Sequence, residues 1–364
     1  MPTVRGEVTL TPFSNLDRAM MQRALALAEN GLWTATPNPR VGCVLAQGER
    51  IVGEGWHQAA GAPHAEANAL AAAGAQARGA TAFVTLEPCN HHGRTPPCAG
   101  ALAHAGVTRV VAAARDPNPQ AEGGGAALAA AGIRFEHGLL EDEARELNIG
   151  FFSRVTRGRP WVRLKIAATL DGRTALADGR SQWITGPEAR LDGHRWRARA
   201  CAILTGIGTV KADDPRLTVR EVRTPRQPLR VVVDSRLEIS AGARILDGGN
   251  TIVFCAQPGA APQGVETITL PNSQGKVDLP RMLEELARRG VNELQVEAGF
   301  RLNGSLLREG CVDELLLYFN PSVLGDGAQG MFDLPSLATL EARPRLALRS
   351  VERVGEDLRI VARL

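Results

Sequence analysis

The chain has 364 residues, of which 44% are hydrophobic and 22% charged, a balance that is typical of globular proteins at a length that suits two domains. Its net charge is only +3 and aromatic residues make up 4%, so neither a basic groove nor a stacking platform for nucleic acid is expected. No apolar run approaches about 20 residues, and the first residues lack the apolar core of a signal peptide, which argues against a membrane span and indicates a cytoplasmic protein.

The first half of the sequence predicts an α/β sandwich around one mixed sheet. Apolar residues at helical spacing, with glycine or proline near the ends, predict helices over 15–30, 64–73, from Pro97 onwards, and over 141–157. Short apolar runs between turn residues predict strands over 41–46, 50–55, 81–86, 109–114 and 133–136. Because helices alternate with strands after an initial hairpin, we expect the helices to cover a single sheet.

Three potential metal ligands lie near the starts of helices or the end of a strand in this half. His64 opens the second helix, Cys89 follows the strand over 81–86, and Cys98 begins the next helix. One imidazole and two thiolates suit zinc, and three protein ligands leave one tetrahedral position open for water. Glu66 is badly placed to join the same ligand shell but well placed to move protons beside it, which indicates a hydrolytic deaminase.

The other histidines and cysteines of this half leave one alternative open. His91 and His92 lie between the two cysteines, so either could close the tetrahedron as the fourth ligand of a purely structural zinc site. Cys43 lies in the middle of a predicted strand and is expected to be a small core residue. The six cysteines are too few for a disulfide framework in a chain of this length, and zinc thiolates favour a reducing compartment.

The second half predicts another α/β domain after a linker at 157–160, so the domains are expected at 1–157 and 158–364. Strands are predicted over 161–168, 200–205, 230–234, 251–255, 293–297 and 314–320, and helices over 187–199 and 279–289. Lys165 lies inside the first strand, so its ammonium group must reach a polar cleft or an anion, or lie in solvent at a sheet edge. Residues 204–210 and 297–305 each run from a strand through glycines towards a helix, an arrangement that can hold phosphate but lacks the Rossmann fingerprint.

The first half resembles the cytidine-deaminase superfamily and, within it, the deaminase domain of the bifunctional riboflavin-biosynthesis deaminase/reductases. The superfamily usually has Pro-Cys-x-x-Cys, whereas eight residues separate Cys89 from Cys98 here, and this longer insertion is itself typical of the riboflavin enzymes. So are the motifs Pro37-Asn38-Pro39, Gly53-Glu54-Gly55-Trp56-His57 and Asp116-Pro117-Asn118-Pro119. The resemblance implies zinc on His64, Cys89 and Cys98, with Glu66 as proton shuttle. It also implies substrate contacts from Asn38 and His57, with simple turn formation as the alternative role of Asn38.

The second half resembles the reductase domain of the same enzymes, which has a fold like that of dihydrofolate reductase and uses NADPH. The similarity rests on Leu170-Asp171-Gly172-Arg173, Ser181-Gln182-Trp183-Ile184-Thr185, residues 212–220, Val233-Asp234-Ser235 and Val296-Glu297-Ala298-Gly299. The resemblance implies a cofactor site formed by Ala167, Trp183, Thr209, Asp213, Ser235 and the loop of Gly299, Phe300, Arg301, Leu302, Asn303, Gly304 and Ser305. It implies substrate contacts from Ser181, Arg197, Leu217, Arg220 and Glu297. Lys165 and Asp213 are the candidates for polarising the sugar carbon that receives hydride.

Together the two resemblances predict a bifunctional enzyme of riboflavin biosynthesis. The first domain would use zinc hydroxide to deaminate 2,5-diamino-6-ribosylamino-4(3H)-pyrimidinone 5′-phosphate, and the second would use NADPH to reduce the ribosyl group of 5-amino-6-(5-phosphoribosylamino)uracil to ribityl. The expected partner is thus a phosphorylated pyrimidine, and we expect a homo-oligomer that binds neither nucleic acid nor a membrane. The alternatives are a deaminase of another nucleobase substrate with an inactive or binding-only second domain, a nucleic-acid-editing deaminase, and a non-catalytic zinc-stabilised scaffold.

Overall fold

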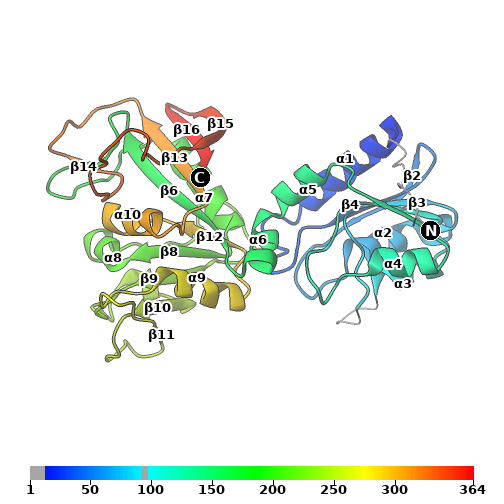
Figure 1. Ribbon diagram of the computed structural model, residues 1–364, viewed down its shortest axis with the longest axis horizontal. Helices are drawn as coiled ribbons and strands as arrows, with labels where there is room; N and C mark the ends of the chain where they lie inside the picture. The colour runs from blue at the N-terminus through cyan, green and yellow to red at the C-terminus, as the bar shows by residue number, and fades with distance from the viewer. Residues whose placement is uncertain (1–12, 92–96) are drawn as a thin grey trace, which may run out of the picture. The chain divides into compact units, whose positions relative to one another are not determined.

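The computed structural model describes residues 13–91 and 97–364 and divides the chain into two compact units, Met1–Asn148 and Ile149–Leu364 (Figure 1). This division lies nine residues before the predicted boundary, because helix α6 (Ile149–Arg157) contacts strands β6 (Trp161–Thr169) and β12 (Glu293–Val296) of the second unit. In the described residues, no helix has both the length and the apolar character that crossing a membrane requires.

The first unit is built on a five-stranded sheet with the order β2-β1-β3-β4-β5, in which β1 is antiparallel to β2 and β3 while β3, β4 and β5 run parallel. Its strands are β1 (Gly42–Gln47), β2 (Arg50–Trp56), β3 (Thr81–Leu86), β4 (Arg109–Ala114) and β5 (Arg134–His137). Its helices are α1 (Asn15–Glu29), α2 (Ala65–Ala73), α3 (Cys98–His104), α4 (Gly124–Ala130) and α5 (Glu141–Leu147), with a 3-10 turn at Gly74–Ala77. Helices α1 and α5 cover one face and α2, α3 and α4 the other, which confirms the predicted α/β sandwich (Figure 1).

Two glycines of β2 allow α2 to lie very close to this sheet. A Cβ atom on Gly53 would lie 2.3 Å from the carbonyl oxygen of Ala69, and one on Gly55 would lie 2.5 Å from that of Ala65. Both distances are far below a van der Waals contact, so any side chain at either position would push the helix away. The glycines of β2 therefore set the distance between the sheet and the first turn of α2, where His64 and Glu66 lie.

The prediction of a single helix over 141–157 is wrong, because the chain leaves the helical conformation at Asn148 and forms two helices, α5 and α6. The Asn148 side chain is buried and pairs with the backbone of Arg40, accepting from its N–H at 2.7 Å and donating to its carbonyl at 2.8 Å. The linker predicted at 157–160 is also a turn within the second unit, where Arg157 and Arg159 pair with Asp313 at 2.8 and 2.5 Å.

The second unit contains a nine-stranded sheet with the order β11-β10-β9-β8-β12-β6-β13-β16-β15. The strands from β11, through β10, β9, β8, β12 and β6, to β13 all run parallel to one another. Strand β16 is antiparallel to both of its neighbours, β13 and β15. The remaining strands are β7 (Arg173–Ala175), β8 (Ala202–Gly206), β9 (Leu229–Val233), β10 (Thr251–Cys255), β11 (Glu266–Thr269), β13 (Glu314–Asn320), β14 (Gln329–Gly330), β15 (Ala347–Val354) and β16 (Asp357–Arg363). The remaining helices are α7 (Pro187–Arg199), α8 (Ile207–Asp213), α9 (Leu279–Arg288) and α10 (Phe300–Arg308), with a 3-10 turn at Arg244–Leu246.

The two faces of this sheet differ in character at the central strands. The face under α9 and α10 is an apolar core that includes Val162, Leu164 and Ile166 of β6. The opposite face, under α7, carries a row of charged side chains. Arg163 is only 2% exposed and bonds to Glu314 of β13 at 2.5 Å and to Glu293 of β12 at 3.1 Å.

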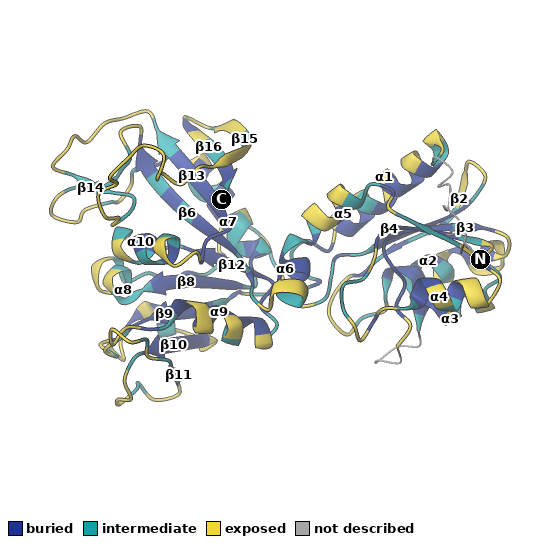
Figure 2. Cartoon of the chain, viewed as in Figure 1, coloured by how far each residue is buried: buried dark blue, intermediate teal, exposed yellow. Residues whose placement is uncertain are grey.

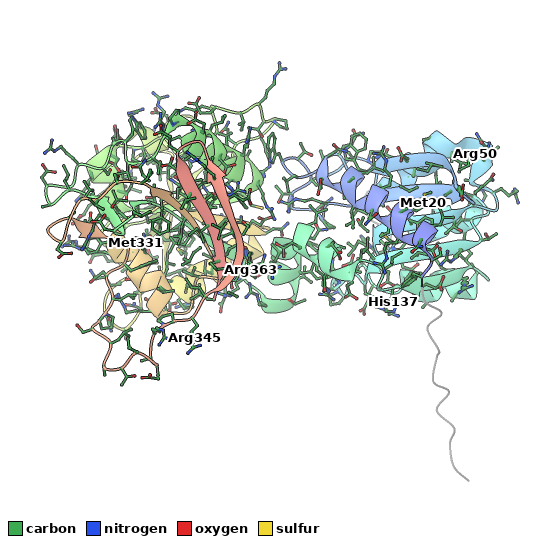
Figure 3. The ribbon with its side chains drawn as sticks, turned by 90° about the horizontal axis from the view of Figure 1, so that it is seen from above. Met20, Arg50, His137, Met331, Arg345 and Arg363 are labelled. Carbon is green, nitrogen blue, oxygen red and sulfur yellow. The ribbon has the colours of Figure 1, made fainter. Side chains whose placement is uncertain are left out.

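The row continues beyond these three residues to the helix and to the next strand. Arg199 of α7 pairs with Glu293 at 2.7 Å, and Arg363 of β16, labelled in Figure 3, pairs with Glu314 at 3.0 Å. Each buried carboxylate thus lies between two guanidinium groups, which offsets the cost of removing these charges from water.

Replacing Arg163 by methionine should destabilise the second unit, because Glu293 and Glu314 would each lose a buried cationic partner. We expect the free energy of unfolding to fall by about 3 kcal/mol. Urea unfolding followed by tryptophan fluorescence can measure this, since Trp196 lies 4.3 Å from the Arg163 guanidinium carbon. The matched control, Arg281→Met on the exposed side of α9, should change stability by less than about 0.5 kcal/mol. Equal urea midpoints for the two variants would contradict a stabilising role for the row.

Candidate functional sites

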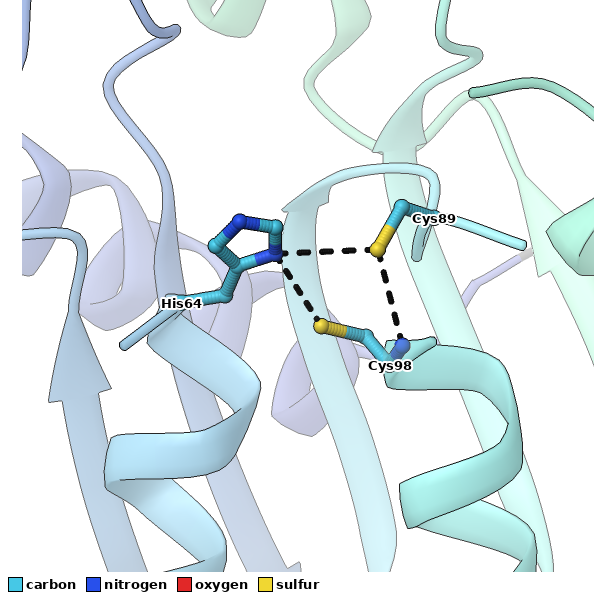
Figure 4. Close-up of side chains that lie close together, drawn as sticks. All are labelled: His64, Cys89 and Cys98. Atoms are coloured by element: carbon cyan, nitrogen blue, oxygen red, sulfur yellow. Dashed lines mark hydrogen bonds between the residues drawn. The ribbon is translucent and has the colours of Figure 1, made fainter. Parts of the chain in front are cut away.

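The three predicted metal ligands converge in the first unit (Figure 4). His64 is the N-cap residue of α2, Cys89 lies three residues after β3, and Cys98 is the first residue of α3. The Nδ1 atom of His64 lies 3.3 Å from the Cys98 Sγ and 3.6 Å from the Cys89 Sγ, and the Cys98 backbone N–H donates to the Cys89 Sγ at 3.5 Å. Three different elements therefore bring their donor atoms to one point.

The donor set fits zinc. Zinc bonds of about 2.3 Å to sulfur and about 2.0 Å to nitrogen give donor–donor distances of roughly 3.5 Å around a tetrahedron, and the donor atoms here lie within 4.8 Å of one another. Within 13–91 and 97–364 the group holds no fourth histidine, cysteine or acidic residue. His91 is exposed, and His92 lies outside the described residues. The described residues therefore offer three protein donors, the number that a catalytic zinc site with one open position uses.

The protonation of the two thiols is already unequal in the protein. A hydrogen bond from Cys98 lowers the pKa of the Cys89 thiol, and the same contact raises the pKa of Cys98. The bond to Cys89 in turn raises the pKa of His64. A bound cation would favour the thiolate form of both sulfurs.

Glu66 lies in the first turn of α2, beside the ligands, and is only 4% exposed. Burial raises the pKa of its carboxyl group to about 7. A carboxyl group that titrates near neutral pH can both accept and release a proton during a reaction, which is the property that a proton shuttle needs.

Asn38 and His57 lie next to the ligands. The Asn38 amide nitrogen is 3.0 Å from the His57 Nε2, and the His57 Nδ1 is 3.2 Å from the carbonyl oxygen of Pro63. Because a carbonyl can only accept, Nδ1 carries the proton and Nε2 accepts from Asn38. The His57 ring also meets the His64 ring edge to face, with centroids 5.5 Å apart. Asn38 thus does more than form its turn, since it bonds to an imidazole that contacts the predicted metal ligand His64.

In the second unit, Lys165 lies between strands rather than at an edge. Strand β6 has β12 on one side and β13 on the other, which excludes the sheet-edge alternative. Glu297 follows the end of β12, and Arg197 of α7 forms two bonds with its carboxylate at 2.7 and 2.8 Å. Burial lowers the pKa of Lys165, and the charge of Glu297 partly opposes this. Burial alone would raise the pKa of Glu297, but Arg197 lowers it to about 2. The structure therefore brings together three of the predicted residues.

The predicted cofactor residues follow the carboxyl ends of neighbouring parallel strands. Ala167 lies near the end of β6, Thr209 follows β8, Ser235 follows β9 and Gly299 follows β12. The Thr209 hydroxyl lies 3.6 Å from where a Cβ on Gly299 would be, so the turns after β8 and β12 lie side by side. Ligands of open α/β sheets bind at this edge, and the N-terminus of α10, capped by the exposed Gly299, has the polarity that a cofactor phosphate requires.

The prediction of a loop from Gly299 to Ser305 is wrong, because helix α10 begins at Phe300. Phe300, Arg301, Leu302 and Ser305 lie in its first two turns. Asn303 and Gly304 are buried on the side that packs against the chain near residue 333. A Cβ on Gly304 would lie 2.1 Å from the carbonyl oxygen of Asp333, and the Asn303 amide donates to the Met331 carbonyl at 3.3 Å. These two residues set how closely that segment packs on the helix.

The other predicted reductase residues surround α7 and the end of α8. Ser181 is half-buried, and Trp183 is 67% exposed with the Arg190 guanidinium 4.8 Å from its ring. Asp213 ends α8, and burial raises its pKa. Leu217 is buried, whereas the Arg220 side chain is exposed.

Two buried residues of this site were not identified from the sequence. Gln295 is fully buried on β12 and donates to Glu297 at 2.7 Å, and His194 lies on α7 one turn before Arg197. A signal for Gln295 was present, because polar residues at 293, 295 and 297 alternate with Leu294 and Val296 in a buried strand.

Comparisons with known proteins agree with this division into two sites. A model of the cytidine and deoxycytidylate deaminase zinc-binding region matches residues 14–114, and a model of the RibD C-terminal domain matches residues 160–360. The riboflavin biosynthesis protein RibD of Escherichia coli K12 is 47% identical over 358 residues, covering 94% of this chain and 98% of that protein. The chain belongs to the RibD family. The RibD of Aquifex aeolicus is 41% identical over 351 residues, covering 94% of this chain and 97% of its own length.

Solved RibD structures share the fold of nearly the whole chain. RibD of Acinetobacter baumannii superimposes with a TM-score of 0.89 at 42% identity, covering 96% of this chain and 98% of that one. The Thermotoga maritima diaminohydroxyphosphoribosylaminopyrimidine deaminase/5-amino-6-(5-phosphoribosylamino)uracil reductase gives 0.88 at 34% identity, with the same coverage. RibD membership confirms the predicted fold class and a bifunctional deaminase and reductase of riboflavin biosynthesis that uses zinc and NADPH.

Loss of one ligand should release the metal from this RibD protein. The purified chain should contain about one zinc per molecule, and Cys98→Ala should lose most of it because only two ligands remain. Atomic absorption after extensive dialysis measures the content. The control is Cys43→Ala, which removes another buried thiol of the same unit, on β1, and should retain zinc. Equal zinc contents in the two variants would exclude Cys98 as a ligand.

Proposed function

We propose that the first unit deaminates 2,5-diamino-6-ribosylamino-4(3H)-pyrimidinone 5′-phosphate, and that the second unit then reduces the sugar of 5-amino-6-(5-phosphoribosylamino)uracil. The observation that carries the proposal is the trio of candidate ligands with Glu66 beside it, in a chain whose second unit brings Lys165, Glu297 and Arg197 together on the face of the sheet under α7. The reaction that the Thermotoga maritima relative is named for supports the choice of substrates.

In the deaminase site, the chain binds the pyrimidine and moves protons. The chemistry that zinc supplies when bound to His64, Cys89 and Cys98 is acidification of a water molecule. Glu66 would accept one proton from that water and deliver it to the ring nitrogen as the C–O bond forms. It would then accept the proton of the new hydroxyl group and deliver it to the amino group, whose C–N bond breaks, so one water is consumed and one ammonia released. Asn38 and His57 orient the ring.

In the reductase site, the chain holds the open-chain sugar. NADPH supplies hydride to the carbonyl carbon, and the carbonyl oxygen needs a proton or a cation at the same moment. The Lys165 side chain serves this purpose, because it lies beside the Glu297 carboxylate, whose negative charge partly opposes the lowering of the Lys165 pKa by burial. Arg197 fixes Glu297, and Ser181, Leu217 and Arg220 contact the phosphorylated sugar. Asp213, the last residue of α8, is the second candidate for polarising the sugar carbonyl.

Two variants should separate the activities, and each serves as control for the other. Glu66→Gln should lower ammonia release about 100- to 10,000-fold but leave NADPH oxidation with the deaminated pyrimidine intact. Lys165→Met should do the reverse, because each change lies in a different unit. Mass spectrometry of the products with and without NADPH measures both steps.

The wild-type chain should yield only the deaminated pyrimidine without NADPH and the ribityl product with it. Unimpaired ammonia release by Glu66→Gln would remove that residue from the mechanism. A chain that never oxidises NADPH would instead support the alternative of an inactive second domain. Lys276→Met is the matched control for Lys165→Met, since Lys276 is an exposed lysine of the same unit.

We also propose that the protein is a cytoplasmic homo-oligomer. The requirement for two zinc thiolates supports a reducing compartment. The edge strand β15 and the chain before it expose apolar side chains, among them Leu340 (75%), Leu348 (66%) and Val351 (55%), which supports burial against a second copy (Figure 2).

Light scattering should give at least twice the mass of one chain, and Leu348→Asp should lower the measured mass. A monomer at micromolar concentration would contradict the proposal.

A further inference from the structure

The segment from Leu217 to Arg220 has an irregular backbone that side chains hold in place. It lies between α8 and β9, and its first residue is buried with a φ of +48°. The Arg197 guanidinium donates to the Thr218 carbonyl at 3.2 Å. The Arg220 N–H donates to the Nδ1 of His194 at 3.3 Å.

A third side chain, that of Gln227, holds the middle of the segment. The Val219 N–H donates to the Gln227 side-chain oxygen at 2.8 Å, and the Gln227 amide donates back to the Val219 carbonyl at 2.9 Å. Backbone groups in an irregular segment usually bond to water. Here three consecutive residues bond to side chains of α7 and of the chain before β9, so the shape of the segment is set in advance of binding.

His194 has the properties that this task requires. It is 4% exposed and is the only histidine in residues 149–364. The charged groups around it are Arg197 of α7, Arg220 of the segment, Lys165 of β6 and Glu297 after β12. Burial, together with these cations, lowers the pKa of His194 to about 4. The ring is therefore neutral at pH 7, so Nδ1 accepts from the Arg220 N–H without adding a fourth positive charge.

We propose that His194 and Gln227 are positioning residues that hold the Leu217–Arg220 segment in the shape that binds the phosphorylated sugar of the reductase substrate. This inference rests on the proposed function of the second unit. A segment that contacts the sugar away from the reacting carbon contributes equally to ground-state and transition-state binding. Loosening it should raise the KM for the pyrimidine substrate and leave kcat and the KM for NADPH nearly unchanged.

The test measures steady-state NADPH oxidation by the full-length protein with 5-amino-6-(5-phosphoribosylamino)uracil. His194→Leu removes the acceptor for the Arg220 N–H and should raise the KM for this substrate about tenfold. His194→Gln offers an amide oxygen at a similar reach and should restore most of the affinity. Gln227→Ala should raise the same KM, and it is safe for folding because Gln227 is exposed. Ammonia release by the first unit reports that each variant is correctly quantified, and an unchanged KM for NADPH reports that the second unit is folded.

The matched controls are Arg195→Ala on the exposed side of α7 and Arg223→Ala on the exposed chain near Gln227, and both should behave like wild type. If His194→Leu does not fold, Gln227→Ala alone decides. An unchanged KM for the pyrimidine in Gln227→Ala overturns the inference. So does a His194→Leu variant in which kcat falls and both KM values rise to a similar extent, if His194→Gln shows the same changes. A wild-type chain without NADPH oxidation would overturn the proposed function instead, so the two failures are distinguishable.

Discussion

The buried charge row centred on Arg163 is the constraint on which the second unit depends. Arg163 pairs in register with Gln295 of β12 and with Glu314 of β13, so its two carboxylate partners lie on the same face of neighbouring strands. Lys165 is two residues further along β6 and therefore points to that same face. A slip of one residue would move both cations into the apolar core under α9 and α10. The ion pairs at the amino ends of these strands thus help to deliver Lys165 to Glu297 at their carboxyl ends.

The first unit achieves comparable precision with backbone contacts instead of charges. Gly53 and Gly55 let α2 approach the sheet, which sets the position of His64. On the other side of the site, the buried Glu87 carboxylate accepts the Gly125 N–H at 2.8 Å, and a Cβ on Gly124 would lie only 1.7 Å from the Pro88 carbonyl oxygen. The start of α4 therefore packs directly on the chain that carries Cys89. Close packing of this kind leaves the three predicted ligands little freedom, which would preorganise the site for the metal that we propose.

The sequence allowed prediction where the determinants are local. The convergence of His64, Cys89 and Cys98 was predictable because ligand type and helix starts lie within 35 residues, and the unusual position of Lys165 because a lone cation in an apolar strand is conspicuous. The break between helices α5 and α6 at Asn148 could not be predicted, because it depends on a contact with Arg40, which is 108 residues away. The role of Gly304 depends in the same way on Asp333, which the chain brings back against α10. Strand β15 was missed because its side chains are mostly exposed and give no buried-strand pattern. Non-local contacts decided each of these features.

The two sites also show how one physical effect can yield opposite chemistry. Glu66 and Glu297 are both removed from water, and burial pushes the pKa of each carboxyl group upwards. For Glu66 burial dominates and the pKa rises to about 7, so the group can exchange protons at neutral pH. Glu297 faces Arg197 and Lys165, and its pKa falls to about 2. It is a permanent anion that holds its cationic neighbours in place. The identity of the neighbouring side chains, rather than burial, therefore makes one carboxylate suitable for the proposed proton transfer and the other suitable for the proposed binding role.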